Sequence, residues 1–389
     1  MSSPRFSLVL CYAAMTALAA AVNLLPVFLT TLSADLGGLT DEQLGRIAAV
    51  TIGGLVLGII SSGPLADRVG LRVFAVGGNL LIAAGLVWMA YAPDYASVLA
   101  ATATMGLGAG ALDMVLSPIV AALCPDRRTV AMNLLHSFYC SGAVVVILAG
   151  AVALKLGYGW RELAGVLAIW PVVVGLGFWR VPLPPLVAEG DVRTPLRHLL
   201  GQRSFVLALI AIGLGGATEA GMAYWLPAYA EKTLMFSPFV SGVALAAFTL
   251  MMTIGRLGIG WLPPSWSPVQ IMLVGCALSV VLFMLASFAP VNGVALAACV
   301  LAGLTGSCLW PSVLAVTADR FPSGGATMFA LLAALGNVGA TVMPWLVGGV
   351  ADASTMRLGL ATAGLCPLLM IGVLLMMRTT PVAPPRPAV

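Results

Sequence analysis

Charged residues are scarce in this chain of 389 residues: Asp, Glu, Lys and Arg together make up 8% of it, whereas 61% is hydrophobic. A soluble domain carries about a quarter of its residues as charged side chains. The composition therefore excludes a water-soluble globular protein and indicates an integral membrane protein. The net charge of +4 is interpreted as a signal of membrane topology, and no nucleic-acid partner is expected.

Several patterns needed for other chemistries are also missing. Two histidines are too few for a histidine-rich metal site, and no glycine-rich phosphate loop ends in lysine. The seven cysteines lie mostly within apolar runs and have neither zinc-ligand spacing nor the pattern of a disulfide framework. We therefore expect no metal, no cofactor, no nucleotide-driven pumping and no enzyme activity.

What the chain has instead is a succession of long apolar runs. Runs of about 20 apolar residues are long enough to cross a bilayer as helices. The predicted fold class is an all-α integral membrane protein with twelve transmembrane helices in two pseudo-symmetric six-helix bundles. The spans are expected near residues 6–32, 44–62, 73–92, 97–123, 130–153, 161–179, 204–230, 238–260, 269–288, 292–317, 327–350 and 358–377.

The basic residues indicate the orientation. With the N-terminus inside, most of the 18 Lys and Arg residues, Arg256 among them, fall on the cytoplasmic side, as the positive-inside rule requires. We expect a monomer in the lipid bilayer of the inner (plasma) membrane, multi-pass, with both termini in the cytoplasm. The expected parts are an N-terminal bundle at 1–180, a cytoplasmic linker at 181–203, a C-terminal bundle at 204–378 and a disordered cytoplasmic tail at 379–389.

The two halves repeat one another. Gly110, Pro118 and the pair Asp126-Arg127 have the same spacing as Gly303, Pro311 and the pair Asp319-Arg320. This match relates the fourth predicted helix to the tenth. Transporters built from parallel repeats bind their substrate at the interface of the repeats, near the middle of the membrane. The repeat therefore favours a transporter.

The most specific short motif lies between the second and third helices, where the stretch from Gly63 to Arg72 reads GPLADRVGLR. It resembles the signature loop of the major facilitator superfamily. The resemblance implies a cytoplasmic gate in which Asp67, Arg68 and Arg72 pair across helix ends. The corresponding loop of the second half, from Gly255 to Trp266, has no aspartate.

A narrower resemblance covers the fifth and seventh helices. Residues 132–143 read MNLLHSFYCSGA, and residues 218–220 and 225–229 read TEA and WLPAY. These stretches are similar to fucose-permease-like sugar:cation symporters. The resemblance implies a sugar substrate and a proton-coupling carboxylate in the fourth helix, where this chain has Asp113.

Two carboxylates, Asp113 and Glu219, remain inside predicted spans once those in or beside loops are set aside. Buried ionisable groups are costly there and mark functional sites. We interpret Asp113 as the coupling acid, His136 as its hydrogen-bond partner or relay, and Glu219 as a substrate ligand or second titrating site. Purely structural roles are the alternative. The coupling ion is expected to be a proton, with Na⁺ as the alternative.

Polar and aromatic side chains at similar depth are candidates for substrate binding. Aromatic rings can stack on a sugar while amides exchange hydrogen bonds with its hydroxyls, although each ring can equally serve packing or anchor an interface. The candidates are Asn23, Asn133, Phe138, Tyr139, Tyr224, Trp225, Trp310 and Asn337.

Three functions are compatible with these features. The favoured one is a secondary active transporter that works by alternating access and takes up a small hydrophilic nutrient, such as a monosaccharide, together with protons. The first alternative is a proton-coupled exporter of amphipathic compounds. The second is a non-transporting membrane sensor built on the same fold.

Overall fold

The computed structural model describes residues 4–185, 193–263 and 265–379. These ranges contain twelve helical spans that are long and apolar enough to cross a membrane. The prediction of an all-helical, twelve-span membrane protein is confirmed. The predicted tail lies outside the described residues from position 380 onward. The spans are Pro4–Val27, Gln43–Val69, Leu71–Ala90, Tyr95–Leu123, Pro125–Lys155, Trp160–Arg180, Arg203–Lys232, Phe239–Trp261, Pro268–Phe288, Asn292–Arg320, Gly325–Ala353 and Met356–Thr379.

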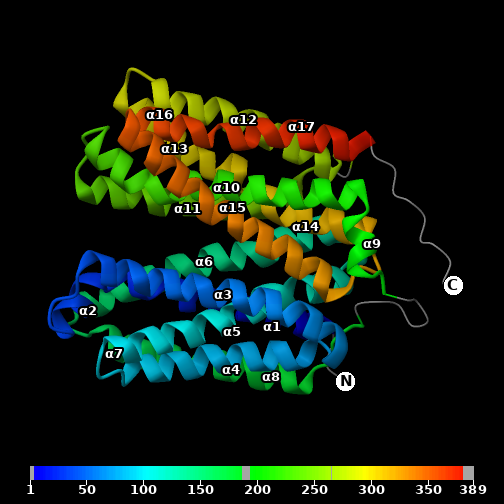
Figure 1. Cartoon of the computed structure of the whole chain (residues 1–389), viewed down its shortest axis with the longest axis horizontal. Coiled ribbons are helices and arrows are strands. Elements are labelled where there is room, and N and C mark those ends of the chain that lie inside the picture. Colours follow the sequence, from blue (N-terminus) through cyan, green and yellow to red (C-terminus); the bar gives the residue numbers. More distant parts are fainter. Residues whose placement is uncertain (1–3, 186–192, 264, 380–389) are drawn as a thin grey trace. The chain divides into compact units, whose positions relative to one another are not determined.

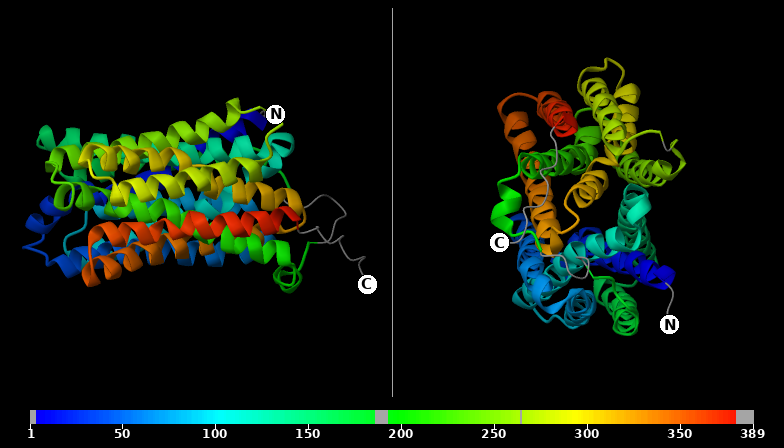
Figure 2. Two further views of the ribbon diagram at one scale, coloured as in Figure 1. Left: turned by 90° about the horizontal axis from the view of Figure 1, so that it is seen from above. Right: turned by 90° about the vertical axis from the view of Figure 1, so that its right-hand side faces the viewer.

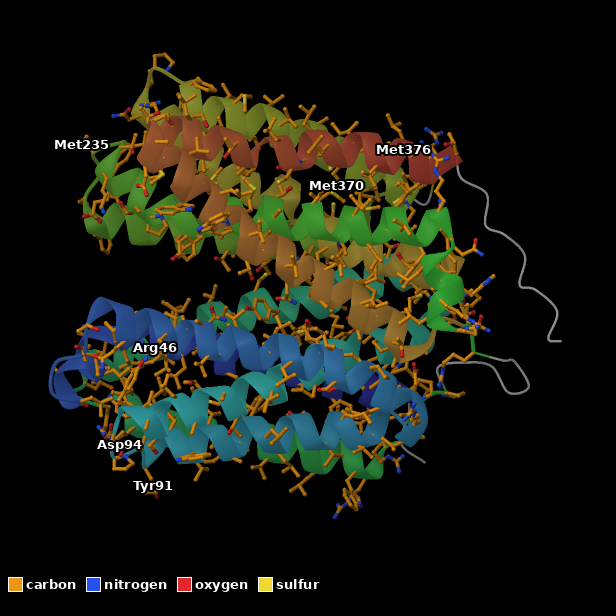
Figure 3. All side chains as sticks on the ribbon, viewed as in Figure 1. Arg46, Tyr91, Asp94, Met235, Met370 and Met376 are labelled. Carbon is orange, nitrogen blue, oxygen red and sulfur yellow. The ribbon has the colours of Figure 1, made fainter. Side chains whose placement is uncertain are left out.

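Several helices begin at side chains that suit a helix start. Thr40 precedes α3 (Asp41–Val69), where its hydroxyl accepts from the Gln43 amide at 3.2 Å and the Gln43 side chain accepts from the Thr40 amide at 2.9 Å. Asp94 (Figure 3) caps α5 (Tyr95–Leu123) by accepting from the Ser97 amide at 2.8 Å. These bonds satisfy amides that have no partner within the helix, so they define where the spans begin.

The chain divides into two compact units, and most contacts lie within one unit or the other. The first comprises Met1–Cys124, Phe138–Glu189 and Gly325–Ala330. The second comprises the remainder, so two helices are shared between the units. The start of α6 (Arg128–Lys155) belongs to the second unit, and the start of α15 (Gly325–Ala353) belongs to the first. The predicted domain boundaries stay a prediction.

Glycines bring two helices of the first unit close together. α3 and α5 lie side by side (Figure 1), with Gly58 of α3 against Gly110 of α5. A Cβ atom on Gly110 would overlap the carbonyl oxygen of Leu55. Small residues allow such close approach of backbones in membrane helices. This contact supports the part of α5 that carries Asp113, three residues further on. The other helices of this unit are α1 (Pro4–Asn23), α2 (Leu29–Asp35), α4 (Leu71–Ala90), α7 (Trp160–Leu167) and α8 (Ile169–Arg180).

In the second unit, α12 lies lengthwise beside α16 and α17, which follow one another along the chain (Figures 1 and 2). The tenth span is interrupted between α13 and α14, and the twelfth between α16 and α17. Pro311 and Pro367 are each the third residue after the interruption. Proline lacks the amide hydrogen that would bond the carbonyl four residues earlier, so it favours a break at this position. The helices of this unit are α9 (Leu196–Leu200), α10 (Arg203–Lys232), α11 (Pro238–Gly258), α12 (Pro268–Phe288), α13 (Asn292–Gly306), α14 (Leu309–Arg320), α16 (Met356–Ala363) and α17 (Leu365–Thr379).

Candidate functional site

An ion pair inside the second unit joins α10 to α11. Nη2 of Arg256 lies 2.9 Å from Oε2 of Glu219, and the side chains are 3% and 27% exposed. The positive-inside pattern places Arg256 among the cytoplasmic basic residues, and its side of the membrane stays a prediction; the structure places it in the last turn of α11. Because α11 continues to Gly258, the Arg256 side chain is buried within a membrane-spanning helix rather than in a loop. Glu219 thus has a cationic partner that the sequence interpretation does not include.

Arg256 also binds two backbone carbonyls. Its Nε donates to the Ser307 carbonyl at 3.0 Å, and Nη1 donates to the His136 carbonyl at 2.9 Å. Ser307 lies at the interruption of the tenth span, four residues before Pro311, so its carbonyl is the one that the proline leaves without a helical donor. Gly255 allows the close approach, since a Cβ there would meet the Ser307 hydroxyl. The broken helix therefore supplies an acceptor that holds the guanidinium in place.

The electrostatics of this pair restrict how it can change state. A guanidinium stays protonated at every physiological pH, so Arg256 keeps its positive charge. The opposing negative charge can be lost in two ways, by protonation of Glu219 or by movement of its side chain. An uncompensated cation that is buried among helices is unfavourable, and another anion then becomes a suitable partner. The pair can therefore exchange a carboxylate of the protein for one of a ligand.

Two candidate residues of α6, Asn133 and His136, belong to the same unit as this pair. Asn133 is fully buried, and its amide nitrogen donates to the Thr129 carbonyl at 2.8 Å and to the Ser312 hydroxyl at 3.2 Å. His136 is 7% exposed, and its backbone carbonyl is the one that Arg256 binds. Within the described part of the chain, the Asn133 amide oxygen and Nε2 of His136 have no hydrogen-bond partner. The predicted contact of His136 with Asp113 stays a prediction, because the two residues belong to different units.

The aromatic candidates of the second unit have different environments. The Trp310 ring lies against Gly216 of α10 and Gly336 of α15, and a Cβ on Gly336 would overlap it. Its Nε1 is buried and has no hydrogen-bond partner among the described residues. Trp225 donates to the Pro344 carbonyl at 2.8 Å, which is a structural bond between α10 and α15. Trp310 is thus the better placed of the two to offer a donor to a ligand.

The two remaining candidates of this unit have simple surroundings. Tyr224 is 69% exposed and contacts the edge of Trp225, with ring centroids 5.4 Å apart. Asn337 donates to the Ala333 carbonyl of its own helix at 2.9 Å. Their roles in substrate binding stay predictions.

In the first unit, three of the predicted substrate residues lie on α1 or contact it. Asn23, the last residue of α1, donates to the Tyr139 hydroxyl at 3.4 Å. Phe138 stacks on Tyr12 with ring centroids 4.8 Å apart and rings 2° from parallel. Asp113 lies on α5 of the same unit and is partly exposed. This unit therefore offers stacked rings, an amide and a carboxylate.

The predicted gate residues also have clear positions. The Asp67 carboxylate accepts from the backbone amides of Ala326 and Thr327 at 2.7 and 3.0 Å and from the Thr327 hydroxyl at 2.5 Å. These donors form the first turn of α15, where the helix dipole favours a negative charge. Arg72 donates to the Val181 carbonyl at 2.8 Å, and Arg68 is exposed. Asp67 thus fastens the end of α3 to the start of α15.

With this geometry established, comparison with known proteins defines the class. A family model described as the Major Facilitator Superfamily matches residues 9–322. The chain belongs to the major facilitator superfamily of membrane transporters, as the motif from Gly63 to Arg72 predicts, and transporters are not enzymes.

Particular relatives narrow the comparison. The gentisate transporter of Corynebacterium glutamicum is 26% identical over 333 residues, which cover 80% of this chain and 73% of the relative. The 3-(3-hydroxy-phenyl)propionate transporter of Escherichia coli is 28% identical over 366 residues, 89% of this chain and 88% of the relative. Among solved structures, the fucose:proton symporter of Escherichia coli has a TM-score of 0.83 at 18% identity, over 97% of this chain and 99% of that one. The last likeness shows the fold alone.

Proposed function

We propose that this protein is a proton-coupled secondary transporter that takes up a small organic anion by alternating access. Arg256 binds the substrate carboxylate, and Glu219 carries the coupling proton. The observation that carries this proposal is the buried Arg256, which is 3% exposed and whose charge is opposed by a carboxylate at 2.9 Å. A fixed cation inside a membrane-spanning helix matches an anionic substrate better than a neutral one.

The proposed cycle is an exchange of partners. When Glu219 takes up a proton, Arg256 loses its counter-charge and attracts the carboxylate of the substrate. When the site opens to the other side and the substrate leaves, Glu219 releases its proton and pairs with Arg256 again. One proton and one monovalent anion then move together, so the step carries no net charge. Asp113 of the first unit is a second acid that could carry a proton.

Two relatives support the choice of an anion. Gentisate and 3-(3-hydroxy-phenyl)propionate, the compounds after which those transporters are named, are both aromatic carboxylates. A monosaccharide, the substrate expected from the sequence, is neutral and would make no use of the charge on Arg256. The organic anion is therefore the stronger proposal.

The test is uptake into liposomes that contain the purified full chain. With the lumen alkaline, we expect labelled 4-hydroxybenzoate to accumulate and labelled monosaccharides to stay out. Arg256→Gln should abolish accumulation. Arg161→Gln is the matched control, because it breaks the partly exposed pair of Arg161 with Asp35 at 3.3 Å, and we expect it to transport normally. Asp113→Asn shows whether the first unit contributes a second proton site. Gradient-driven accumulation of a sugar without any carboxylate, or full activity of Arg256→Gln, would contradict the proposal.

A further inference from the structure

We infer that the organic anion carries a hydroxyl group and that Asn133 and His136 bind it. This inference rests on the proposed function and adds a second point of recognition to the same site. It starts from two buried polar atoms, the amide oxygen of Asn133 and Nε2 of His136, which have no hydrogen-bond partner among the described residues. The residues are three positions apart on α6, so they lie on one face of the helix.

Buried polar atoms almost always have a partner, so two exceptions three positions apart on one helix need a cause. The Asn133 amide group is held in place, because its nitrogen already donates to Thr129 and Ser312. Its oxygen is therefore presented with its lone pairs unused. An imidazole nitrogen can donate or accept, depending on which nitrogen carries the proton. The pair thus offers one fixed acceptor and one adaptable atom.

These two atoms select a particular chemical group. A carboxylate would face the Asn133 oxygen with its own lone pairs, which is repulsive. An ammonium group would lie near Arg256, whose Nη1 is bonded to the His136 carbonyl at 2.9 Å, and like charges would repel. A hydroxyl group can donate its proton to the Asn133 oxygen and accept a hydrogen bond from the imidazole. A neutral hydroxyl group is therefore the best match.

The same α6 segment connects this point to the charged one. The backbone of His136 is bound by Arg256, which in turn binds Glu219 at 2.9 Å. Ser312, which orients Asn133, lies one residue after the proline that frees the Ser307 carbonyl for Arg256. The carboxylate-binding and hydroxyl-binding groups are thus positioned by the same two parts of the fold, which are α6 and the break between α13 and α14 with the first turn of α14. A hydroxylated carboxylate engages both, whereas a plain carboxylate leaves the α6 atoms unsatisfied.

The experiment compares binding of 3-hydroxybenzoate, 4-hydroxybenzoate and benzoate to the full chain in lipid nanodiscs by titration calorimetry. Leaving buried groups unpaired weakens binding, so we expect at least one hydroxybenzoate to bind about tenfold to a hundredfold more tightly than benzoate. Asn133→Leu and His136→Phe should each reduce this preference about tenfold or more, with benzoate affinity little changed. His136→Gln, which keeps a hydrogen-bonding side chain, should retain part of the preference.

Asn79→Leu is the matched control. Asn79 is also fully buried with an unpartnered amide oxygen, but it lies on α4 of the first unit, so the preference should not change. Benzoate binding reports whether each variant is folded. Equal affinity of the native protein for all three acids, or an unchanged preference in both Asn133→Leu and His136→Phe, would overturn the hydroxyl inference and leave the proposed function intact. Failure of the native protein to bind any of the acids would overturn the proposed function as well.

Discussion

Replacing Glu219 with glutamine leaves the guanidinium of Arg256 without its counter-charge. Removing one partner of a buried pair costs about 3–5 kcal/mol, because the remaining charge stays buried. Arg256 is 3% exposed and Glu219 is 27% exposed, so water can solvate a lone Glu219 better than a lone Arg256. We therefore expect Glu219→Gln to lower the free energy of unfolding by about 3 kcal/mol or more. Arg256→Gln, which leaves the Glu219 carboxylate unpaired, should lower it by less.

The ligand should reverse part of this loss. In Glu219→Gln, a bound carboxylate restores the missing charge, so 4-hydroxybenzoate should stabilise this variant more than the native protein. At a concentration about 100 times its Kd, a ligand adds about 2.7 kcal/mol. Thermal unfolding in detergent with a thiol-reactive dye suits the measurement, because six of the seven cysteines are buried and become reactive on unfolding.

The double variant provides the internal control. If the two residues interact as the 2.9 Å contact indicates, Glu219→Gln combined with Arg256→Gln should be more stable than the sum of the single losses by about 0.5–3 kcal/mol. If Glu219→Gln unfolds at the same temperature as the native protein, and 4-hydroxybenzoate stabilises the variant and the native protein equally, Arg256 does not depend on this counter-charge.

Two further results are expected from thermal unfolding of single variants. Gly110→Ala should lower the unfolding temperature and reduce the free energy of unfolding by about 1–3 kcal/mol, because its Cβ would overlap the Leu55 carbonyl. Gly77→Ala, whose Cβ meets nothing within 4 Å, should be neutral or stabilising. A similar effect at both positions would show that α3 and α5 are not in close contact. Asp67→Asn should cost about 0.5–2 kcal/mol, because it removes a negative charge from the first turn of α15. The loss should shrink at high salt, and a loss that does not depend on salt would contradict the electrostatic explanation.

The spans can be predicted from sequence because hydropathy over about 20 residues reports directly on membrane crossing. The eighth span, predicted at residues 238–260 and observed at Phe239–Trp261, contains one charged residue, Arg256, which the positive-inside pattern counts only as a topology signal. A charge inside its own predicted span was the available signal, since such residues face the protein interior and have partners.

Other features of the site depend on contacts that no local pattern reveals. Pro311 predicts a free carbonyl at Ser307, but only the fold shows that Arg256 binds it. The motif around Asp67 predicts a gate, whereas its partners Ala326 and Thr327 lie about 260 positions away in the sequence. Neither pairing has a spacing rule from which it could be predicted.

Coupling of a proton to an organic anion by Glu219 and Arg256 can be tested by a single flux measurement. Liposomes that contain the full chain and a trapped pH indicator are given labelled 4-hydroxybenzoate outside, and label and internal pH are recorded together. We expect one proton to enter with each anion in the native protein, independent of membrane potential, and Glu219→Gln to exchange label without proton movement. Proton entry that persists in Glu219→Gln with unchanged stoichiometry would show that another group carries the proton.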